Sequence, residues 1–129
     1  MICFITARAE IELFGRISEK EDIIAKDIEV KKEILFELNK NDFAYKLISK
    51  SGVFAINVFP YGKDREQEIC ESKEGEFTDK FKACNFERIE CSSIDCPAIG
   101  KATIYECSVN EIKEDKATAS IKANVLVSH

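Results

Sequence analysis

Several features that mark common classes of protein are missing from this sequence. Its longest apolar runs cover only a few residues, far below the roughly 18 that a membrane-spanning helix needs. Lysines alternate with glutamates and the net charge is −5, so no basic cluster is available to hold a nucleic-acid backbone. The opening MICFITARAE lacks the basic start of a signal peptide. We therefore expect a cytoplasmic protein with no membrane and no nucleic-acid partner.

Histidine is almost absent, and the cysteines are spaced unlike those of a metal site. The single histidine is His129, so no Ser-His or Cys-His catalytic pair can be identified. No two of the six cysteines form the Cys-x-x-Cys spacing typical of zinc or redox sites. We expect buried or half-buried thiols; a disulfide joining Cys91 to Cys84 or to Cys96 stays open. No metal site is predicted, and the catalytic residues are unknown.

Repeats, low-complexity tracts and Pro/Gly/Ser-rich linkers are also lacking, so residues 1–129 are predicted to form a single domain. The apolar run 2–7 is suited to a buried strand. Short β-leaning pieces separated by charged residues follow between Ile11 and Leu38, with Gly15 expected at a bulge or a close approach of strands. These patterns favour a mainly β fold.

The stretch 42–59 predicts a helix that runs directly into a strand. Phe43, Leu47 and Ile48 recur on one helical face, opposite Lys46 and Lys50. The preceding Asp42 can cap the helix, and Gly52 can adopt the left-handed conformation that ends it. The nearly all-apolar VFAINVF then forms a buried strand.

Two further helices and a hairpin are predicted in the second half. One helix covers 63–75 and ends at Gly75; another buries a face made of Phe77, Phe81 and Cys84. The strands 102–109 and 119–127 alternate with period 2, which places Glu106 on the polar face and Val127 on the apolar one. Short strands before and after small helices, without a βαβ rhythm, point to an antiparallel barrel with helical insertions.

Four stretches resemble a known family: FITARAEIELFG (4–15), KNDFAYKLISKSGVFAINVFP (40–60), TDKF (78–81) and CPAIGKATIYECSV (96–109). Together they resemble the flavin-reductase-like, FMN-binding split-barrel proteins of the flavoredoxin type. The resemblance implies a mainly β, antiparallel split β-barrel with short helices, completed across a homodimer. It also implies FMN in a groove at the subunit interface and electron transfer between a reduced nicotinamide, NAD(P)H, and the flavin.

The resemblance carries the cofactor-binding role to four residues of this chain. Lys40 matches a cation ahead of the helix, and Thr6 matches a hydroxyl at the end of the first strand. Asn41 occupies the position of the family's threonine beside that cation, and Phe43 matches a helix aromatic that can also pack into the core. Flavin phosphates are held by hydroxyls, backbone N–H groups and cations at helix starts.

The chain departs from the family pattern at several of these positions. Asp42 places a negative charge near the expected phosphate. Asp22 and Ala25 stand where the family has an asparagine and a threonine. Three hypotheses follow: an FMN-binding reductase-like protein, a flavin-free paralogue that acts as an interaction or assembly subunit, and an unrelated small-ligand binder that shares only the barrel.

Overall fold

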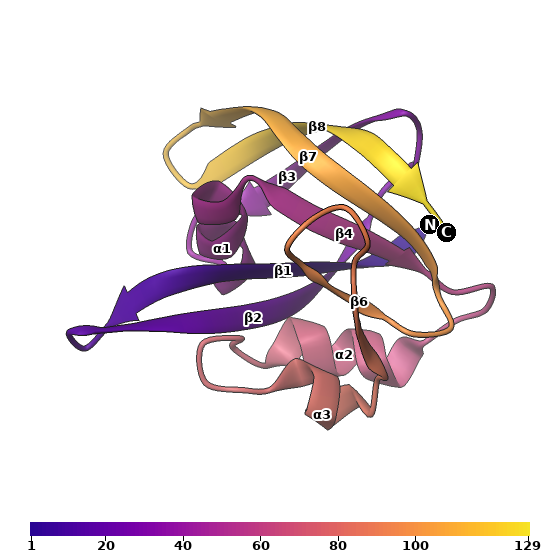
Figure 1. The fold of residues 1–129 in the computed structure, drawn as a ribbon, viewed down its shortest axis with the longest axis horizontal. Helices are drawn as coiled ribbons and strands as arrows, with labels where there is room; N and C mark the ends of the chain where they lie inside the picture. Colours follow the sequence, from indigo (N-terminus) through magenta and orange to yellow (C-terminus); the bar gives the residue numbers. More distant parts are fainter.

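The computed structural model describes all residues 1–129, which form eight strands and three helices (Figure 1). Their bounds are β1 Ile2–Leu13, β2 Arg16–Asp27, β3 Glu33–Asn39, α1 Phe43–Ser51, β4 Val53–Val58, α2 Asp64–Ser72, α3 Lys80–Cys84, β5 Arg88–Glu90, β6 Pro97–Ile99, β7 Thr103–Glu114 and β8 Thr118–Ser128. None of the helices has the length and apolar character that crossing a membrane would require.

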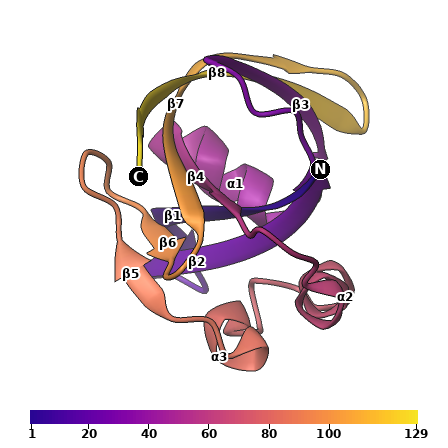
Figure 2. The same ribbon diagram turned by 90° about the vertical axis from the view of Figure 1, so that its right-hand side faces the viewer.

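Six strands form one antiparallel sheet in the order β2-β1-β4-β7-β8-β3, and β5 pairs only with β6. The large sheet curves around α1, while α2, α3 and the β5–β6 pair lie outside the curve (Figure 2). The mainly β, antiparallel split-barrel architecture with short helices is therefore confirmed. Because β2 and β3 end the strand order without pairing to each other, the barrel stays open along these two edges.

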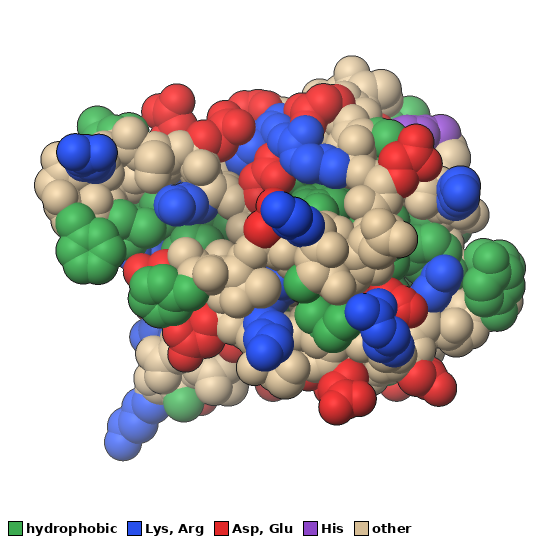
Figure 3. All heavy atoms as spheres, turned by 90° about the horizontal axis from the view of Figure 1, so that it is seen from below, with side chains coloured by type: hydrophobic (Ala, Val, Ile, Leu, Met, Phe, Trp, Pro, Cys, Tyr) green, Lys and Arg blue, Asp and Glu red, His purple; other side chains and the backbone are tan.

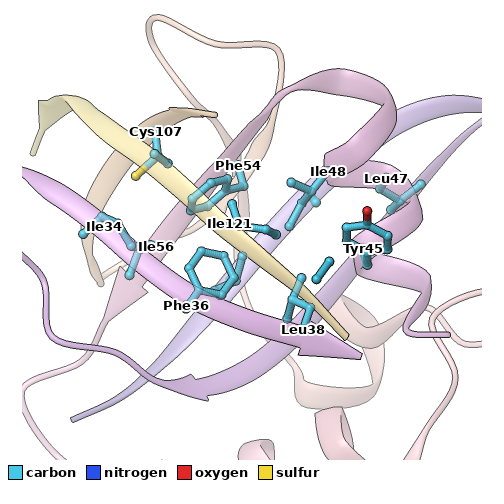
Figure 4. Packing of buried hydrophobic residues seen from close by; sticks show 14 of the residues in the cluster. Ile34, Phe36, Leu38, Tyr45, Leu47, Ile48, Phe54, Ile56, Cys107 and Ile121 are labelled. Carbon is cyan, nitrogen blue, oxygen red and sulfur yellow. The ribbon is translucent and has the colours of Figure 1, made fainter. Parts of the chain in front are cut away.

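The interior of the barrel is filled by alternate residues of the strands and by one face of α1. Leu47 and Ile48 of the helix pack with Phe54 and Phe36 of the strands (Figure 4). The Phe36 and Phe54 rings meet edge to face, with 5.4 Å between their centroids. The expected apolar face of α1 is thus confirmed, with the side chains of Lys46 and Lys50 on its exposed side.

The outer faces of the central strands are covered as well. Phe4 and Ile23 join α2, α3 and β6 in a second apolar cluster around Cys70 and Cys84. The Sγ atoms of these two cysteines lie 3.8 Å apart. All six cysteines are free thiols, five of them buried and Cys91 half-buried. The Cys70–Cys84 contact joins two helices and was not visible in the sequence spacing.

The first two strands are longer than predicted and form one hairpin. They pair without interruption from Ile2 with Asp27 to Leu13 with Arg16. Phe14 and Gly15, with φ of 54° and 77°, form the two-residue turn. The expectation of a bulge at Gly15 was wrong, because a tight hairpin turn places both central residues at positive φ.

Two predicted helix boundaries in the second half and the predicted facing of Val127 were also wrong. Helix α2 ends at Ser72, before Gly75, and α3 begins only at Lys80, so Phe77 lies outside it and is 73% exposed. The register of β7 with β8 shifts between Glu106 and Cys107, which leaves Val127 exposed on the outside. A period-2 pattern does not reveal such a shift, because one extra residue reverses the facing of everything beyond it.

The predicted glycine cap between α1 and β4 is confirmed. Gly52 has φ of 74°, and its N–H donates to the carbonyl of Ile48, which closes the helix. Asp42 occupies the N-cap position, but its side chain accepts no capping hydrogen bond. A Cβ at Gly52 would meet no atom within 4 Å, so the constraint on this position is conformational and not steric crowding.

We predict that Gly52→Val lowers the free energy of unfolding by about 1 to 3 kcal/mol, the cost of holding a β-branched residue at positive φ. Gly52→Asn should cost less, because asparagine tolerates this conformation. Lys50→Ala on the exposed side of α1 is the control and should stay close to wild type. Urea denaturation measures all three. Equal midpoints for Gly52→Val and Lys50→Ala would contradict the assignment.

Candidate functional site

A groove of about 850 Å³ lies between β2, the start of α1, and the segment that runs from the end of α2 into α3. This volume is within the range of small-molecule sites. Three of the four predicted site residues, Lys40, Asn41 and Phe43, line it together. Ile24 and Ala25 of β2 add apolar surface. The structure thus gathers into one groove residues that are separated by 15 or more positions in the chain.

The start of α1 presents a free hydrogen-bond donor to this groove. The carbonyl of Asp42 accepts from the N–H groups of Tyr45 and Lys46, while the N–H of Phe43, which lines the groove, has no partner within the protein. Ala44 is fully buried and does not line the groove. Unpaired N–H groups at a helix start, together with the positive end of the helix dipole, favour an anion. The uncapped start of α1 is therefore suited to a phosphate group.

Lys40 supplies a cation beside this helix start, but it is already engaged. Its Nζ lies 3.3 Å from Oε2 of Glu114 and donates to the carbonyl of Asp115 at 3.1 Å. The Tyr45 hydroxyl and the Lys40 ammonium both lower the pKa of Glu114. The side chain of Lys40 is 31% exposed, so a ligand in the groove can still reach it. Asn41 is exposed and Phe43 is half-buried.

Thr6 lies away from the other three predicted residues. It is fully buried in β1, where its hydroxyl donates to the carbonyl of Pro97 at 2.6 Å and accepts from Nδ2 of Asn57 at 3.1 Å. Oδ1 of Asn57 in turn accepts from the N–H of Ile99. This small network fixes β6 against the barrel. In this structure Thr6 therefore positions neighbouring strands and does not line the groove.

A buried ion pair at the wall of the groove was missed at the sequence level. Nζ of Lys80 lies 2.8 Å from Oδ1 of Asp22 and also donates to the carbonyl of Ile23 at 2.8 Å. Burial raises the pKa of the Asp22 carboxyl, and the Lys80 ammonium opposes that rise. The sequence marked Asp22 as an unusual residue for a phosphate site. Its partner 58 positions away neutralises much of that charge.

Gly75 explains how Asp22 can be covered so closely. A Cβ at this glycine would fall 2.0 Å from Oδ1 of Asp22, so no larger residue fits without displacing the carboxylate. The glycine that was predicted to end a helix is instead required for close packing.

Over the face that carries α2 and α3, acidic and basic side chains are interspersed without a broad patch of either sign (Figure 3).

Comparison with known proteins gives matches only at the level of structure. No protein-family model and no curated protein sequence matches the chain. It is similar to the flavoredoxin of Desulfovibrio vulgaris (Miyazaki F), with a TM-score of 0.79 and 17% identity over 98% of this chain. The 2-nitrobenzoate 2-nitroreductase of Pseudomonas fluorescens gives a TM-score of 0.76 with 16% identity over 99% of this chain.

A flavin reductase with a split barrel domain from Shewanella frigidimarina gives a TM-score of 0.76 with 10% identity over 98% of this chain. The chain has a flavin-reductase-like split-barrel fold. It spans 63%, 68% and 65% of the lengths of the nitroreductase, the flavoredoxin and the flavin reductase, respectively. The predicted resemblance is thereby confirmed for the fold of residues 1–129.

Outside the groove, the split barrel contains a second polar cluster, centred on Glu106. This residue was expected on a polar outer face, but it is completely buried under the loop between β5 and β6. Its carboxylate accepts from the backbone N–H and hydroxyl groups of both Ser92 and Ser93. Nε2 of His129 lies 2.6 Å from Oε2. The serine hydroxyls donate to Glu106 and not to His129, so the cluster holds the loop and forms no nucleophile–base pair.

The Glu106 cluster predicts a pH dependence of stability. Burial alone would raise the pKa of Glu106, but the hydrogen bonds from Ser92, Ser93 and His129 outweigh it and lower the pKa to about 2. A carboxyl with a depressed pKa stabilises the folded state above its unfolded pKa, and this stability is lost as the pH falls from about 4.5 towards 2. The loss amounts to about 3 kcal/mol.

Glu106→Gln should therefore be less stable than wild type at pH 7, and the difference should shrink as the pH falls to 3. Urea denaturation at both pH values measures this. Glu68→Gln, on the exposed side of α2, is the control and should follow wild type at both. A constant difference between Glu106→Gln and wild type across this range would contradict the assigned role of the carboxylate.

Proposed function

We propose that the groove at the start of α1 binds FMN and that the protein acts as a flavin-reductase-like electron carrier between a reduced nicotinamide, NAD(P)H, and flavin. The observation that carries this proposal is that Lys40, Asn41 and Phe43 line one groove at a helix start where the N–H of Phe43 is unpaired. Six free thiols accord with a reducing, cytoplasmic setting.

The groove contains the types of residue that the phosphate and the ring of FMN require. Lys40 and the N–H of Phe43 would hold the phosphate, and Asn41 would add an exposed amide. Phe43, with Ile24 and Ala25, offers an apolar wall for the ring. Bound FMN would supply the redox chemistry, while this chain binds and orients it. Thr6 does not line the groove; its hydroxyl fixes β6 against the central strands of the barrel.

The same residues predict weak binding. Asn41 lacks the hydroxyl of a threonine, Asp42 adds a negative charge, and Lys40 must be shared with Glu114. Losing two or three hydrogen bonds to a charged group, each worth roughly 1.5 to 3 kcal/mol, takes a tight site to the micromolar range or weaker. The engagement of Lys40 with Glu114 and Asp115 also favours the second candidate, a flavin-free interaction or assembly subunit of the same fold.

An FMN titration separates the two candidates. We expect the purified protein to be pale or colourless and to bind added FMN with micromolar affinity, measured by quenching of flavin fluorescence. Lys40→Ala should weaken binding about tenfold, equivalent to roughly 1.4 kcal/mol. Asp42→Thr should strengthen it, because a repulsive charge is removed and a hydroxyl gained.

Lys31→Ala, an exposed lysine between β2 and β3, is the control and should leave FMN affinity unchanged. Absence of binding at millimolar FMN would reject the flavin proposal in favour of the flavin-free subunit. Stoichiometric FMN in bright yellow purified protein would show that the altered residues do not weaken the site.

A homodimer is proposed on separate grounds. The edges of β2 and β3 are unpaired, and large apolar side chains are exposed on or beside these two strands: Phe14 at 94%, Ile17 at 74% and Leu35 at 71%. Open edges and exposed apolar residues favour association. Light scattering at micromolar concentration should therefore report twice the mass of the chain. A monomer throughout a dilution series that begins at high micromolar concentration would reject the dimer.

A further inference from the structure

Two thiols meet where α2 packs against α3, in the layer outside the barrel (Figure 2). Sγ of Cys70 lies 3.8 Å from Sγ of Cys84, and the two residues are 14 positions apart in the chain. A disulfide needs about 2 Å between its sulfur atoms, so a combined movement of roughly 1.8 Å joins them. The connecting residues 73–79 form neither helix nor strand, and α3 is only five residues long. The two thiols can therefore approach each other without unfolding either helix.

The candidate groove gives small molecules access to one member of this pair. Cys70 lines the groove, whereas Cys84 does not. The two residues are only 3% and 4% exposed, so a bulky reagent has little contact with either sulfur. Burial raises the pKa of both thiols, and the nearby Lys80 ammonium opposes that rise. Both thiols are therefore protonated at neutral pH, and their oxidation requires a small neutral oxidant that enters the groove.

The cysteines of the β5–β6 hairpin are the alternative pair. Cys91 faces Cys96 across the end of this hairpin, where the N–H of Cys91 donates to the carbonyl of Cys96 at 3.0 Å. The Cys96 thiol is directed at the carbonyl of Thr6, 3.2 Å away. The sequence left open a disulfide of Cys91 with Cys84 or with Cys96. The structure instead places the Cys84 thiol against that of Cys70, which makes these two the better candidates.

We propose that Cys70 and Cys84 are a redox-sensitive dithiol that hydrogen peroxide converts into a disulfide. Peroxide entering the groove oxidises the Cys70 thiol to a sulfenic acid and is itself reduced to water. The Cys84 sulfur then attacks the Cys70 sulfur, the S–S bond forms, and the hydroxyl leaves with the thiol proton as a second water. One peroxide and two thiols thus yield one disulfide and two waters. The first step is slow because the thiols are protonated, whereas the second joins atoms already in contact.

The bond links the two helices on either side of the segment that forms the outer wall of the groove. Residues 73–76 of this segment line the groove, and Gly75 packs against the carboxylate of Asp22. A disulfide between Cys70 and Cys84 encloses the segment in a covalent loop, which restricts the unfolded chain. The oxidised protein is therefore the more stable form, and the wall of its groove is held covalently. This effect does not depend on whether the groove binds flavin.

The test exposes the reduced protein to hydrogen peroxide for increasing times, without added flavin, so that its outcome is independent of the proposed function. Free thiols are then alkylated in urea and counted by mass spectrometry. We expect six alkylated thiols before treatment and, with one pair joined, four after it. Peptides that contain Cys70 and Cys84 should be recovered as one linked pair, and dithiothreitol should restore all six thiols. The urea midpoint of the oxidised protein should be higher than that of the reduced protein.

Cys84→Ser removes the partner thiol and should abolish the disulfide. Cys91→Ser, at the half-buried thiol, is the control and should still form the Cys70–Cys84 bond. Mapping the linked peptides in the wild-type chain gives the answer even if a variant fails to fold. A bond between Cys91 and Cys96, a cross-link between two chains, or six thiols that persist after treatment would overturn the proposal. A Cys70–Cys84 bond that leaves the urea midpoint unchanged would overturn its stabilising role.

Discussion

The covering of β1 on both faces is the constraint on which the rest of the structure depends. Cys3, Ile5 and Ala7 face the barrel interior, while Phe4 and Thr6 face the layer made by α2, α3 and β6. The backbone groups of β1 are paired within the sheet by β2 and β4, whereas a polar side chain buried on its outer face must find its partners in the covering layer. The hydroxyl of Thr6 and the carbonyl of Pro97 provide one such link, and the Asn57 amide completes it.

The candidate groove is a product of the same two layers. Its walls are β2 and the start of α1 on the barrel side, and the α2–α3 segment on the other. The Asp22–Lys80 pair joins these walls, and Gly75 allows the segment to approach the carboxylate closely. A buried pair of this kind costs desolvation energy, but removing one partner costs more. The pair therefore fixes the spacing of the groove while it adds little net charge to it.

Much of the fold followed from periodicity and turn chemistry. The α1–β4 unit was predicted with its glycine cap, and the β7–β8 hairpin was predicted in outline, because burial of one face imposes a visible pattern on neighbouring residues. Lys40, Asn41 and Phe43 could be placed together because they are close in the chain. At Gly15, Gly75 and Phe77 the predictions were wrong because glycine and aromatic residues there serve turns or surfaces that a local pattern cannot distinguish. The facing of Val127 was wrong because the pattern does not reveal the register shift between β7 and β8.

The sequence by itself determined which residues can form strands, where α1 ends and which side chains surround its start, since these depend on neighbours a few positions apart. Only the tertiary structure decided that Glu106 is buried, that Lys80 neutralises Asp22 and that Thr6 points away from the groove. The physical reason is that hydrogen bonds and ion pairs between distant segments produce no periodic pattern in the sequence. A charged residue looks the same in a sequence whether its partner is water or another side chain.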